Sequence, residues 1–275
     1  MVQWNWNKPS DHRHERRCLI EAAYYHQSHL KKRQDYGHQA VGVILSCNGL
    51  SLDYAIVLYD KTRSKIEIVQ SIINELPKPP GSAYFLGDSW YTSNKLMDDF
   101  AQKGFETIGA LRTNRIIFPN QIRQQAKQFA PCICKDDPNV SLVTVGKRNY
   151  YVYRYQGKMN NRDNAVVLLS YPEKFFGDAK SLRVFISTQT NLSTQEILSI
   201  YVNRWSIEVF FRDCKQKLAF DKCHLRKKKG ITRMWLILSF VHFLCCTIVG
   251  HIGKFDEGFH YFRNCVLQAT LVQDA

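Results

Sequence analysis

Residues 201–217 read YVNRWSIEVFFRDCKQK, and this stretch decides the fold because its side chains follow helical spacing. An α-helix turns about 100° per residue. Counted from Tyr201, the side chains of Arg204, Glu208 and Lys215 therefore fall at about 300°, 340° and 320°, inside a stripe about 60° wide. A helix from 192 to 218 is predicted to carry a carboxylate, two cations and a phenol along one line.

A line of apolar side chains runs along the same predicted helix. Ile200, Ile207, Phe211 and Leu218 recur at spacings of seven, four and seven residues, which is typical of a core-facing side. The helix is thus expected to bury one side and present Glu208 on another. Taken alone, the polar stripe is equally interpreted as a solvent-exposed face with an ordinary ion pair between Arg204 and Glu208.

The composition indicates a folded chain with a polyanionic partner. Its 275 residues are 45% hydrophobic and 13% aromatic, which is enough for a sizeable core and excludes a disordered protein. The net charge of +14 favours nucleic acid ahead of an anionic membrane surface. Nine cysteines without a framework spacing predict reduced thiols, hence a cytoplasmic, nucleoid-associated protein.

Two further patterns in the chain are interpreted as structural. The CxC of Cys132 and Cys134 and the pair Cys223–His224 each lack the second ligand pair of a structural zinc site, so zinc is not expected. The run WLILSFVHFLCCTIVGHI at residues 235–252 is nearly long enough to span a bilayer. Its two histidines favour a buried helix, and no membrane partner is expected.

The pattern of the first 112 residues predicts a hairpin, a helix, a strand, a helix and a strand. Asn48-Gly49 is a hairpin turn signal between two β-rich runs, and a Thr or Ser before Asn94 is a helix cap. The predicted elements are two antiparallel strands at 37–47 and 51–60, a helix at 64–76, a strand at 83–88, a helix at 92–105 and a strand at 106–114.

The middle of the chain changes character and divides the sequence into three parts. After residue 112 the sequence is basic and β-rich, with turn signals between its runs, which predicts a β-rich insertion at 113–190. Residues 1–112 are expected to form the first part of an α/β core. Residues 191–275 are expected to form its last part, with the 192–218 helix and a closing apolar helix.

Two carboxylates in this arrangement are candidate metal ligands. Asp88 follows a predicted buried strand, and ligands of open α/β sheets gather at the carboxyl ends of strands. Asp88 is also ordinary turn chemistry, so its position alone does not decide its role. Together, Asp88 and Glu208 are the hard oxygen ligands that Mg²⁺ uses while it keeps positions open for phosphate oxygens and water. Two such ions about 4 Å apart support phosphoryl transfer.

The residues around these carboxylates suit DNA. Residues 201–230 hold nine Lys/Arg against three Asp/Glu and are named here the basic segment. Arg204 and Lys215 could clamp DNA phosphates beside the metal, Arg204 in forked fashion and Lys215 as a point charge. Trp90, next to Asp88, is a candidate for stacking on an unpaired base, with core packing as the alternative.

These positions match a known family signature. Tyr201, Arg204, Glu208 and Lys215, together with DSWYTS at 88–93, resemble the insertion-sequence DDE transposases of the YREK-signature group. The resemblance implies an α/β ribonuclease H-like fold, a mixed sheet flanked by helices with an inserted β-rich subdomain. It also implies Mg²⁺ or Mn²⁺ bound by Asp88 and Glu208. Its further implications are phosphate contacts from Tyr201, Arg204 and Lys215, a homodimer on DNA, and double-stranded DNA partners (transposon terminal repeats and target).

The sequence departs from the family pattern at its start. The family's first catalytic Asp ends a strand that precedes the hairpin, and no corresponding acidic segment is found there. The chain is therefore interpreted as amino-terminally truncated and catalytically incomplete, with an inactive DNA-binding remnant as the alternative. Residues 1–6 alternate in strand fashion and are expected to fill part of that slot. None of the substitute carboxylates is a convincing third ligand; they are Asp11, Asp35, Asp53 and Asp60.

Overall fold

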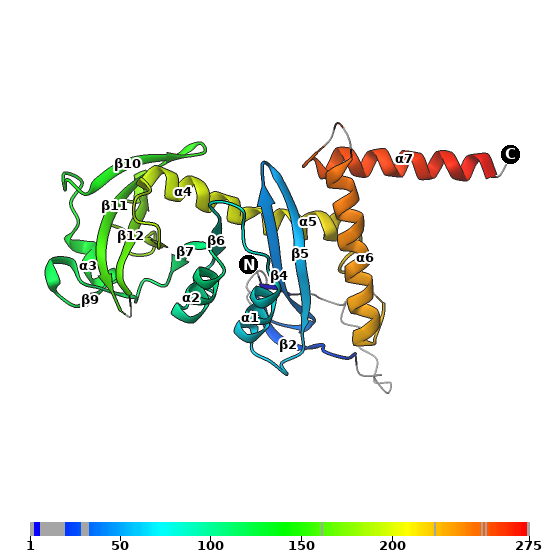
Figure 1. Cartoon of the computed structure of the whole chain (residues 1–275), viewed down its shortest axis with the longest axis horizontal. Helices are drawn as coiled ribbons and strands as arrows, with labels where there is room; N and C mark the ends of the chain where they lie inside the picture. Colours follow the sequence, from blue (N-terminus) through cyan, green and yellow to red (C-terminus); the bar gives the residue numbers. More distant parts are fainter. Residues whose placement is uncertain are drawn as a thin grey trace. The chain divides into compact units, whose positions relative to one another are not determined.

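The computed structural model describes residues 3–5, 20–28, 33–160, 162–222, 224–248, 250 and 252–273 (Figure 1). The chain forms two compact units. Unit 1 comprises Met1–Val69 and Trp205–Ala275, and unit 2 comprises Gln70–Arg204. The three-part division that composition suggests, with boundaries after 112 and 190, stays a prediction.

Unit 1 is built on the predicted hairpin. Strands β4 (Gln39–Cys47) and β5 (Leu50–Tyr59) are antiparallel, with Val41 opposite Val57. The turn between them has φ values of 50° at Asn48 and 81° at Gly49. Two successive positive φ values are what a two-residue hairpin turn of the primed type requires, and Asn-Gly supplies them at low cost. The hairpin prediction is confirmed.

A short strand adds to this hairpin from the start of the chain. Strand β1 (Gln3–Asn5) pairs antiparallel with β4, with Trp4 opposite Ala40, so the sheet order is β1-β4-β5. The expectation that the first residues occupy a strand position is confirmed for 3–5, while residues 1, 2 and 6 lie outside the described part. Strands β2 (Tyr24–Ser28) and β3 (Arg33–Gly37) form a separate two-stranded sheet.

Unit 2 contains a mixed sheet that begins with a strand–helix–strand motif. Strands β6 (Tyr84–Gly87) and β7 (Glu106–Leu111) are parallel, and helix α2 (Asn94–Gln102) connects them. Ser93 is the N-cap of α2, and its side chain accepts a hydrogen bond from the Leu96 amide. The predicted strand, helix and strand are confirmed, as is the preceding helix α1 (Lys65–Glu75).

The β-rich segment extends this sheet. Strand order is β6-β7-β13-β12-β11-β8-β9, β10 pairs with β11, and every pairing except β6–β7 is antiparallel. The predicted β-rich character of 113–190 is confirmed. The segment continues the β6–β7 sheet through β13 and β7, however, and is not a separate sheet. The remaining elements are β8 (Ile116–Ile117), η1 (Pro119–Gln121), β9 (Gln124–Gln125), α3 (Ala126–Phe129), η2 (Ala130–Cys132), β10 (Val140–Val145), β11 (Arg148–Met159), β12 (Arg162–Pro172), η3 (Glu173–Phe175) and β13 (Arg183–Ser187).

The core of unit 2 is centred on β12, because this strand is buried from both faces. One cluster joins Val167 and Leu169 with Ile117 and Ile186. A second cluster joins Leu168 with the residues of α4 (Thr194–Val202). A short strand that is buried on both faces is expected as a continuous apolar run, and β12 has AVVLLSY at 165–171. The mixed sheet flanked by helices confirms the expected α/β fold class.

The predicted 192–218 helix is wrong as a single element. It consists of α4, a 3₁₀ turn η4 (Asn203–Trp205) and α5 (Ser206–Lys217). Asn203 has φ −62° and ψ −16°, and Trp205 has φ −63° and ψ −20°, which are 3₁₀ values. The capping box of Ser193 and Glu196 starts α4 as predicted. One of the two boundaries between the units falls after Arg204, inside the turn, and the other falls after Val69, inside α1.

The closing apolar helix also differs from its prediction. Helix α6 spans Lys228–Thr247 instead of 235–252, and a further helix α7 (Phe255–Gln273) follows it (Figure 1). The prediction of a buried helix is wrong for one face of α6, where Leu236 is 71% and Phe240 is 59% exposed. In the described part of the chain, α6 is the one helix that is long and apolar enough to cross a membrane.

Candidate functional site

Asp88 is fixed by the backbone immediately after β6. Its Oδ1 accepts a hydrogen bond from the Trp90 amide at 2.8 Å, and its carbonyl accepts one from the Tyr91 amide at 3.1 Å. This is the turn chemistry that the sequence offered as the alternative role. It does not exclude metal binding, since a carboxylate has about four lone-pair sites and the turn uses one. The half-buried carboxylate lies at the carboxyl end of a strand that is parallel to its neighbour.

Close packing under the turn explains why its sequence is restricted. Thr92 is fully buried, and its hydroxyl donates to the Ala110 carbonyl at 2.7 Å. A Cβ added at Gly109 would overlap the Thr92 methyl group and lie 3.1 Å from the Gly87 carbonyl oxygen. The loop after β6 is therefore packed directly against β7, and the glycine allows that approach.

A hollow of about 400 Å³ lies beside this turn and is named here the Trp90 hollow. Trp90 is 61% exposed, and the Arg112 guanidinium lies 5.1 Å from the centre of its ring. Arg115 donates from Nη2 to the Thr92 carbonyl at 3.0 Å, which ties the loop to the segment after β7. The alternative of core packing for Trp90 is excluded, because most of the indole is in solvent, and its stacking on a base stays a prediction. The residues lining the hollow are Ser89, Trp90, Thr92, Asn94, Met97, Leu111, Arg112, Asn114, Arg115, Ile116, Met159 and Asn160.

Sequence reasoning missed Arg112 and Arg115. The sequence signal that could have found them is their place directly after β7, in the segment LRTNR at residues 111–115. The carboxyl ends of parallel neighbouring strands lie at the same edge of a sheet, so residues after β7 are expected near those after β6. The two arginines could have been added to the candidate site on that ground.

Glu208 lies in the first turn of α5, in unit 1, and its position depends on packing. The buried residues of α5 are Ile207, Phe210, Phe211 and Cys214. A Cβ added at Gly42 of β4 would lie 3.2 Å from Phe211 Cζ, so the ring packs closely on the strand. The Ser206 hydroxyl also lies 3.2 Å from the Ser46 hydroxyl, within hydrogen-bond distance. These contacts hold the half-buried Glu208 over the hairpin.

The other three signature residues fall in different surroundings. The Tyr201 ring packs edge-on against Phe185 at 4.9 Å, and the Arg204 guanidinium lies 5.7 Å from the Tyr201 ring centre. Unit 2 thus brings Tyr201 and Arg204 together. Lys215 is half-buried in unit 1, and burial lowers the pKa of its ammonium while Asp221 acts in the opposite direction. Their roles toward phosphate stay predictions.

Residues 9–244 match the family model of the transposase DDE domain. The chain belongs to this family. No curated protein matches it significantly. Enzymes of the family act on DNA and generally use divalent metal ions, so the chain is a transposase-type nuclease domain by descent.

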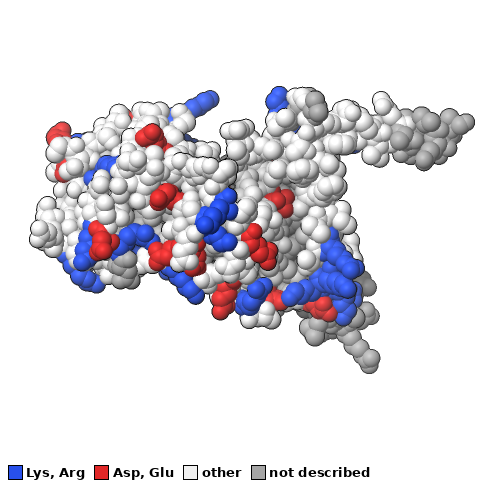
Figure 2. All heavy atoms as spheres, in the orientation of Figure 1, with Lys and Arg blue, Asp and Glu red and all other residues white. Residues whose placement is uncertain are grey.

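Part of the basic segment of this transposase domain is neutralised by carboxylates. Figure 2 shows Lys and Arg gathered where α6 begins. There Lys227 pairs with Glu21 at 2.9 Å, and Lys228 pairs with Asp60. Lys217 pairs with Asp256 at 2.9 Å. These cations therefore form ion pairs within unit 1 as well as adding positive charge. The count of Lys and Arg in residues 201–230 could not separate the paired cations from the others.

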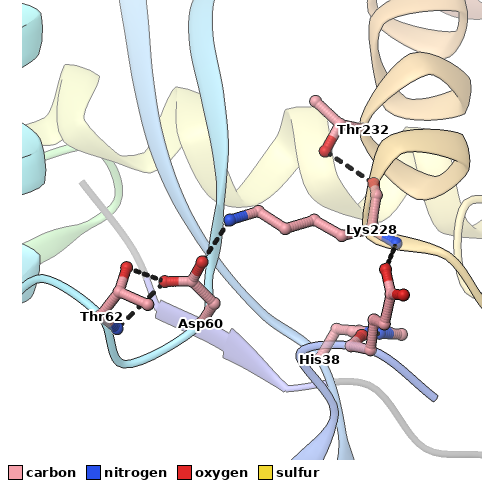
Figure 3. Close-up of polar contacts among 6 residues, drawn as sticks. His38, Asp60, Thr62, Lys228 and Thr232 are labelled. Atoms are coloured by element: carbon pink, nitrogen blue, oxygen red, sulfur yellow. Dashed lines mark hydrogen bonds and ion pairs between the residues drawn. The ribbon is translucent and has the colours of Figure 1, made fainter. Parts of the chain in front are cut away.

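The contacts of Lys228 fasten the start of α6 to the hairpin (Figure 3). Its backbone amide donates to Glu21 Oε2 at 2.8 Å, and its ammonium donates to Asp60. Asp60 also accepts from the Thr62 hydroxyl at 2.6 Å. The hydrogen bonds from Lys228 and Thr62 hold the pKa of the Asp60 carboxyl well below its usual range.

The alternative acidic residues are engaged elsewhere or lie outside the described part. Asp60 is held by Lys228, and the half-buried Asp53 has a raised pKa because of desolvation, opposed by a hydrogen bond from Ser239. Asp35 lies in β3 opposite His26. Asp11 lies outside the described residues.

The described residues contain no group of three or more His, Cys, Asp or Glu side chains that could hold a metal ion. Asp88 belongs to unit 2 and Glu208 to unit 1, and each unit supplies one carboxylate. Their chemistry nonetheless fits a divalent cation, because both are hard oxygen ligands. Cys132 and Cys134 are exposed free thiols, and Cys223 lies outside the described residues.

Proposed function

We propose that this chain acts in DNA transposition, with Asp88 and Glu208 as ligands of Mg²⁺ or Mn²⁺. The observation that carries the proposal is the carboxylate of Asp88, fixed at the carboxyl end of β6 beside the cationic Trp90 hollow. This is where an open α/β sheet binds ligands. The family match supports the same reaction class.

Each signature residue has a role in the proposal. Asp88 and Glu208 hold the ions, which supply activation of an attacking oxygen and stabilisation of the leaving oxygen when bound. Tyr201, Arg204 and Lys215 bind DNA phosphates, and the Arg204 guanidinium lies 5.7 Å from the Tyr201 ring centre. Trp90 stacks on an unpaired base.

The proposed substrate is double-stranded DNA, as transposon terminal repeats and target, and the protein acts in the cytoplasm on the nucleoid. A homodimer is proposed for the DNA complex. The exposed apolar face of α6 makes membrane association the competing outcome. If the protein is recovered in salt-washed membranes and none of it binds DNA, membrane association replaces DNA binding as its function.

The chain is further proposed to be catalytically incomplete by itself. The family pattern requires a first acidic residue, and Asp53 and Asp60 already serve structural contacts. The second candidate is therefore a DNA-binding remnant that occupies transposon ends. This second candidate is favoured by the cations of the basic segment that take no part in the three ion pairs above, such as the exposed Lys229.

Two assays on the purified chain test the proposal. Titration of duplex DNA from the flanks of the coding region, at several salt concentrations, should give binding that weakens steeply with salt. Incubation of that duplex with Mn²⁺ should give no strand cleavage if the chain is incomplete. Cleavage that Asp88→Asn abolishes would support the transposase role and reject incompleteness. Absence of salt-sensitive DNA binding would contradict both candidates.

A further inference from the structure

The Trp90 hollow combines an exposed indole with two adjacent guanidinium groups. Arg112 covers one face of the Trp90 ring at 5.1 Å. Arg115 is half-buried, and burial together with the nearby charge of Arg112 lowers the pKa of its guanidinium. Two like charges held close together are unfavourable unless an anion binds between or beside them.

The hollow contains no carboxylate to neutralise these charges. None of its lining residues is Asp or Glu. Among the described residues, neither Arg112 nor Arg115 has a carboxylate within ion-pair distance. The remaining polar side chains that line the hollow can form hydrogen bonds; they are Ser89, Thr92, Asn94, Asn114 and Asn160. An anion with hydrogen-bonding edges is the matching ligand.

The exposed indole narrows the ligand to a nucleotide whose base is unpaired. Aromatic side chains stack on nucleic-acid bases, and the base faces inside a duplex are already stacked on one another. Trp90 has most of its surface in solvent, and the guanidinium on it adds a cation–π contact. Stacking therefore requires a single-stranded or frayed base.

We propose that the Trp90 hollow binds one unpaired nucleotide of a DNA strand, with its base on Trp90 and its phosphate on Arg112 and Arg115. This inference rests on the proposed function and extends it to the strand beside Asp88. Arg115 also positions the site, because it holds the loop through the Thr92 carbonyl at 3.0 Å. The hollow thereby favours DNA ends that carry a single-stranded extension.

The test compares a blunt duplex with the same duplex carrying a three-nucleotide single-stranded extension, using fluorescence anisotropy and the whole chain. The extension should tighten wild-type binding by about tenfold, because stacking of one base on an aromatic side chain is worth roughly that factor. Trp90→Leu should remove the difference, and Trp90→Phe should keep part of it. Arg112→Gln should reduce the advantage of the extended duplex by several-fold and weaken the salt dependence of its binding.

The matched control is Arg148→Gln, which removes an exposed arginine of β11 outside the hollow. It should leave the advantage of the extension unchanged. A 2-aminopurine at the first unpaired position of the DNA gives a second measurement. Its fluorescence should be quenched when it stacks on Trp90 of the wild-type protein, and the Trp90→Leu variant should quench it less. Circular dichroism melting of each variant separates loss of binding from loss of folding.

The outcomes separate this inference from the proposed function. If wild-type protein binds blunt and extended duplexes equally, or if Trp90→Leu keeps the full advantage, the hollow is not a nucleotide site and the stacking role of Trp90 fails with it. The proposed transposition reaction and its metal ligands then still stand. An equal loss of blunt and extended binding in folded Arg112→Gln would also overturn the inference. If no duplex binds in a salt-dependent manner, the proposed function fails as well.

Discussion

Unit 2 and unit 1 each hold one carboxylate of the proposed site, and they do so by different means. Asp88 is fixed by backbone hydrogen bonds to Trp90 and Tyr91, within a turn of four residues. Glu208 is fixed by the packing of its helix, chiefly Phe211 against Gly42. The position of Asp88 therefore depends on local chain geometry, whereas that of Glu208 depends on contacts far apart in sequence.

The two units also differ in their buried titratable groups. Residues 70–204 contain no histidine. In unit 1, His242 is 3% exposed, with its ring stacked on Phe255 at 4.7 Å and edge-on to Phe210 at the same distance. Burial lowers the pKa of His242 to about 4. Mild acid should therefore destabilise unit 1 at a higher pH than unit 2.

The largest expected effect comes from removing the ring that holds α5. Phe211→Ala should destabilise unit 1 by about 3–5 kcal/mol, because it deletes a fully buried aromatic side chain. Hydrogen exchange should rise at 39–47 and 206–217 and not at 84–111. Phe100→Ala is the matched control in unit 2, where it should raise exchange at 84–111. An equal response of both units to either change would remove the distinction between them.

Acid should produce the next largest effect. The pKa of His242 is lower in the folded chain than its ordinary value near 6.5, so the unfolded chain binds the proton more readily. Its contribution to stability is complete above pH 6.5 and is lost as pH falls toward 4, by about 3 kcal/mol in total. Urea unfolding at pH 7, 5 and 4 measures it. His242→Phe should flatten this dependence; if the variant loses as much stability in acid as wild type, other groups cause the loss.

Crowding beneath the Asp88 turn should have a smaller effect. Gly109→Ala should cost about 1–3 kcal/mol in unit 2, since its Cβ would overlap the Thr92 methyl group. Thermal unfolding measures the loss. The double variant Gly109→Ala/Thr92→Ser removes that methyl group and keeps the hydroxyl, so part of the stability should return. No recovery would show that the Gly87 carbonyl, 3.1 Å from the new atom, causes the strain.

The smallest of these effects concerns the helix cap after the turn. Ser93→Ala removes the side-chain acceptor of the Leu96 amide at the start of α2 and should cost about 1 kcal/mol. Chemical denaturation measures this. Ser93→Asp keeps an acceptor and should retain most of the stability. A cost above about 3 kcal/mol would mean that Ser93 supports the Asp88 turn by more than capping.

The sequence predicted the elements whose signals are local. Asn48-Gly49 specifies the hairpin turn, and Ser93 specifies the start of α2. The 3₁₀ turn at Asn203–Trp205 could not be predicted, because no Pro or Gly marks it and its dihedrals are close to helical. The exposed face of α6 was missed because a helix that is apolar on most sides gives no direction of burial.

In the candidate site, local sequence signals marked the two carboxylates but not the arginines beside Trp90. Asp88 followed from its place after an apolar strand, and Glu208 from helical spacing together with a family signature. Arg112 and Arg115 were missed, since their position beside Trp90 follows from the parallel pairing of β6 and β7, which the sequence does not state. The ion pairs of Lys227 and Lys228 depend on Glu21 and Asp60, which are distant in sequence.

The main proposal is that Asp88 and Glu208 are both ligands of Mg²⁺ or Mn²⁺. Electron paramagnetic resonance titration of Mn²⁺ into the complex of the chain with duplex DNA measures Mn²⁺ binding without requiring cleavage. Asp88→Asn, which keeps the turn acceptor Oδ1, and Glu208→Gln should each weaken Mn²⁺ binding by at least about tenfold. Glu75→Gln, on α1, should change nothing. Unchanged Mn²⁺ affinity in either single variant would contradict the account.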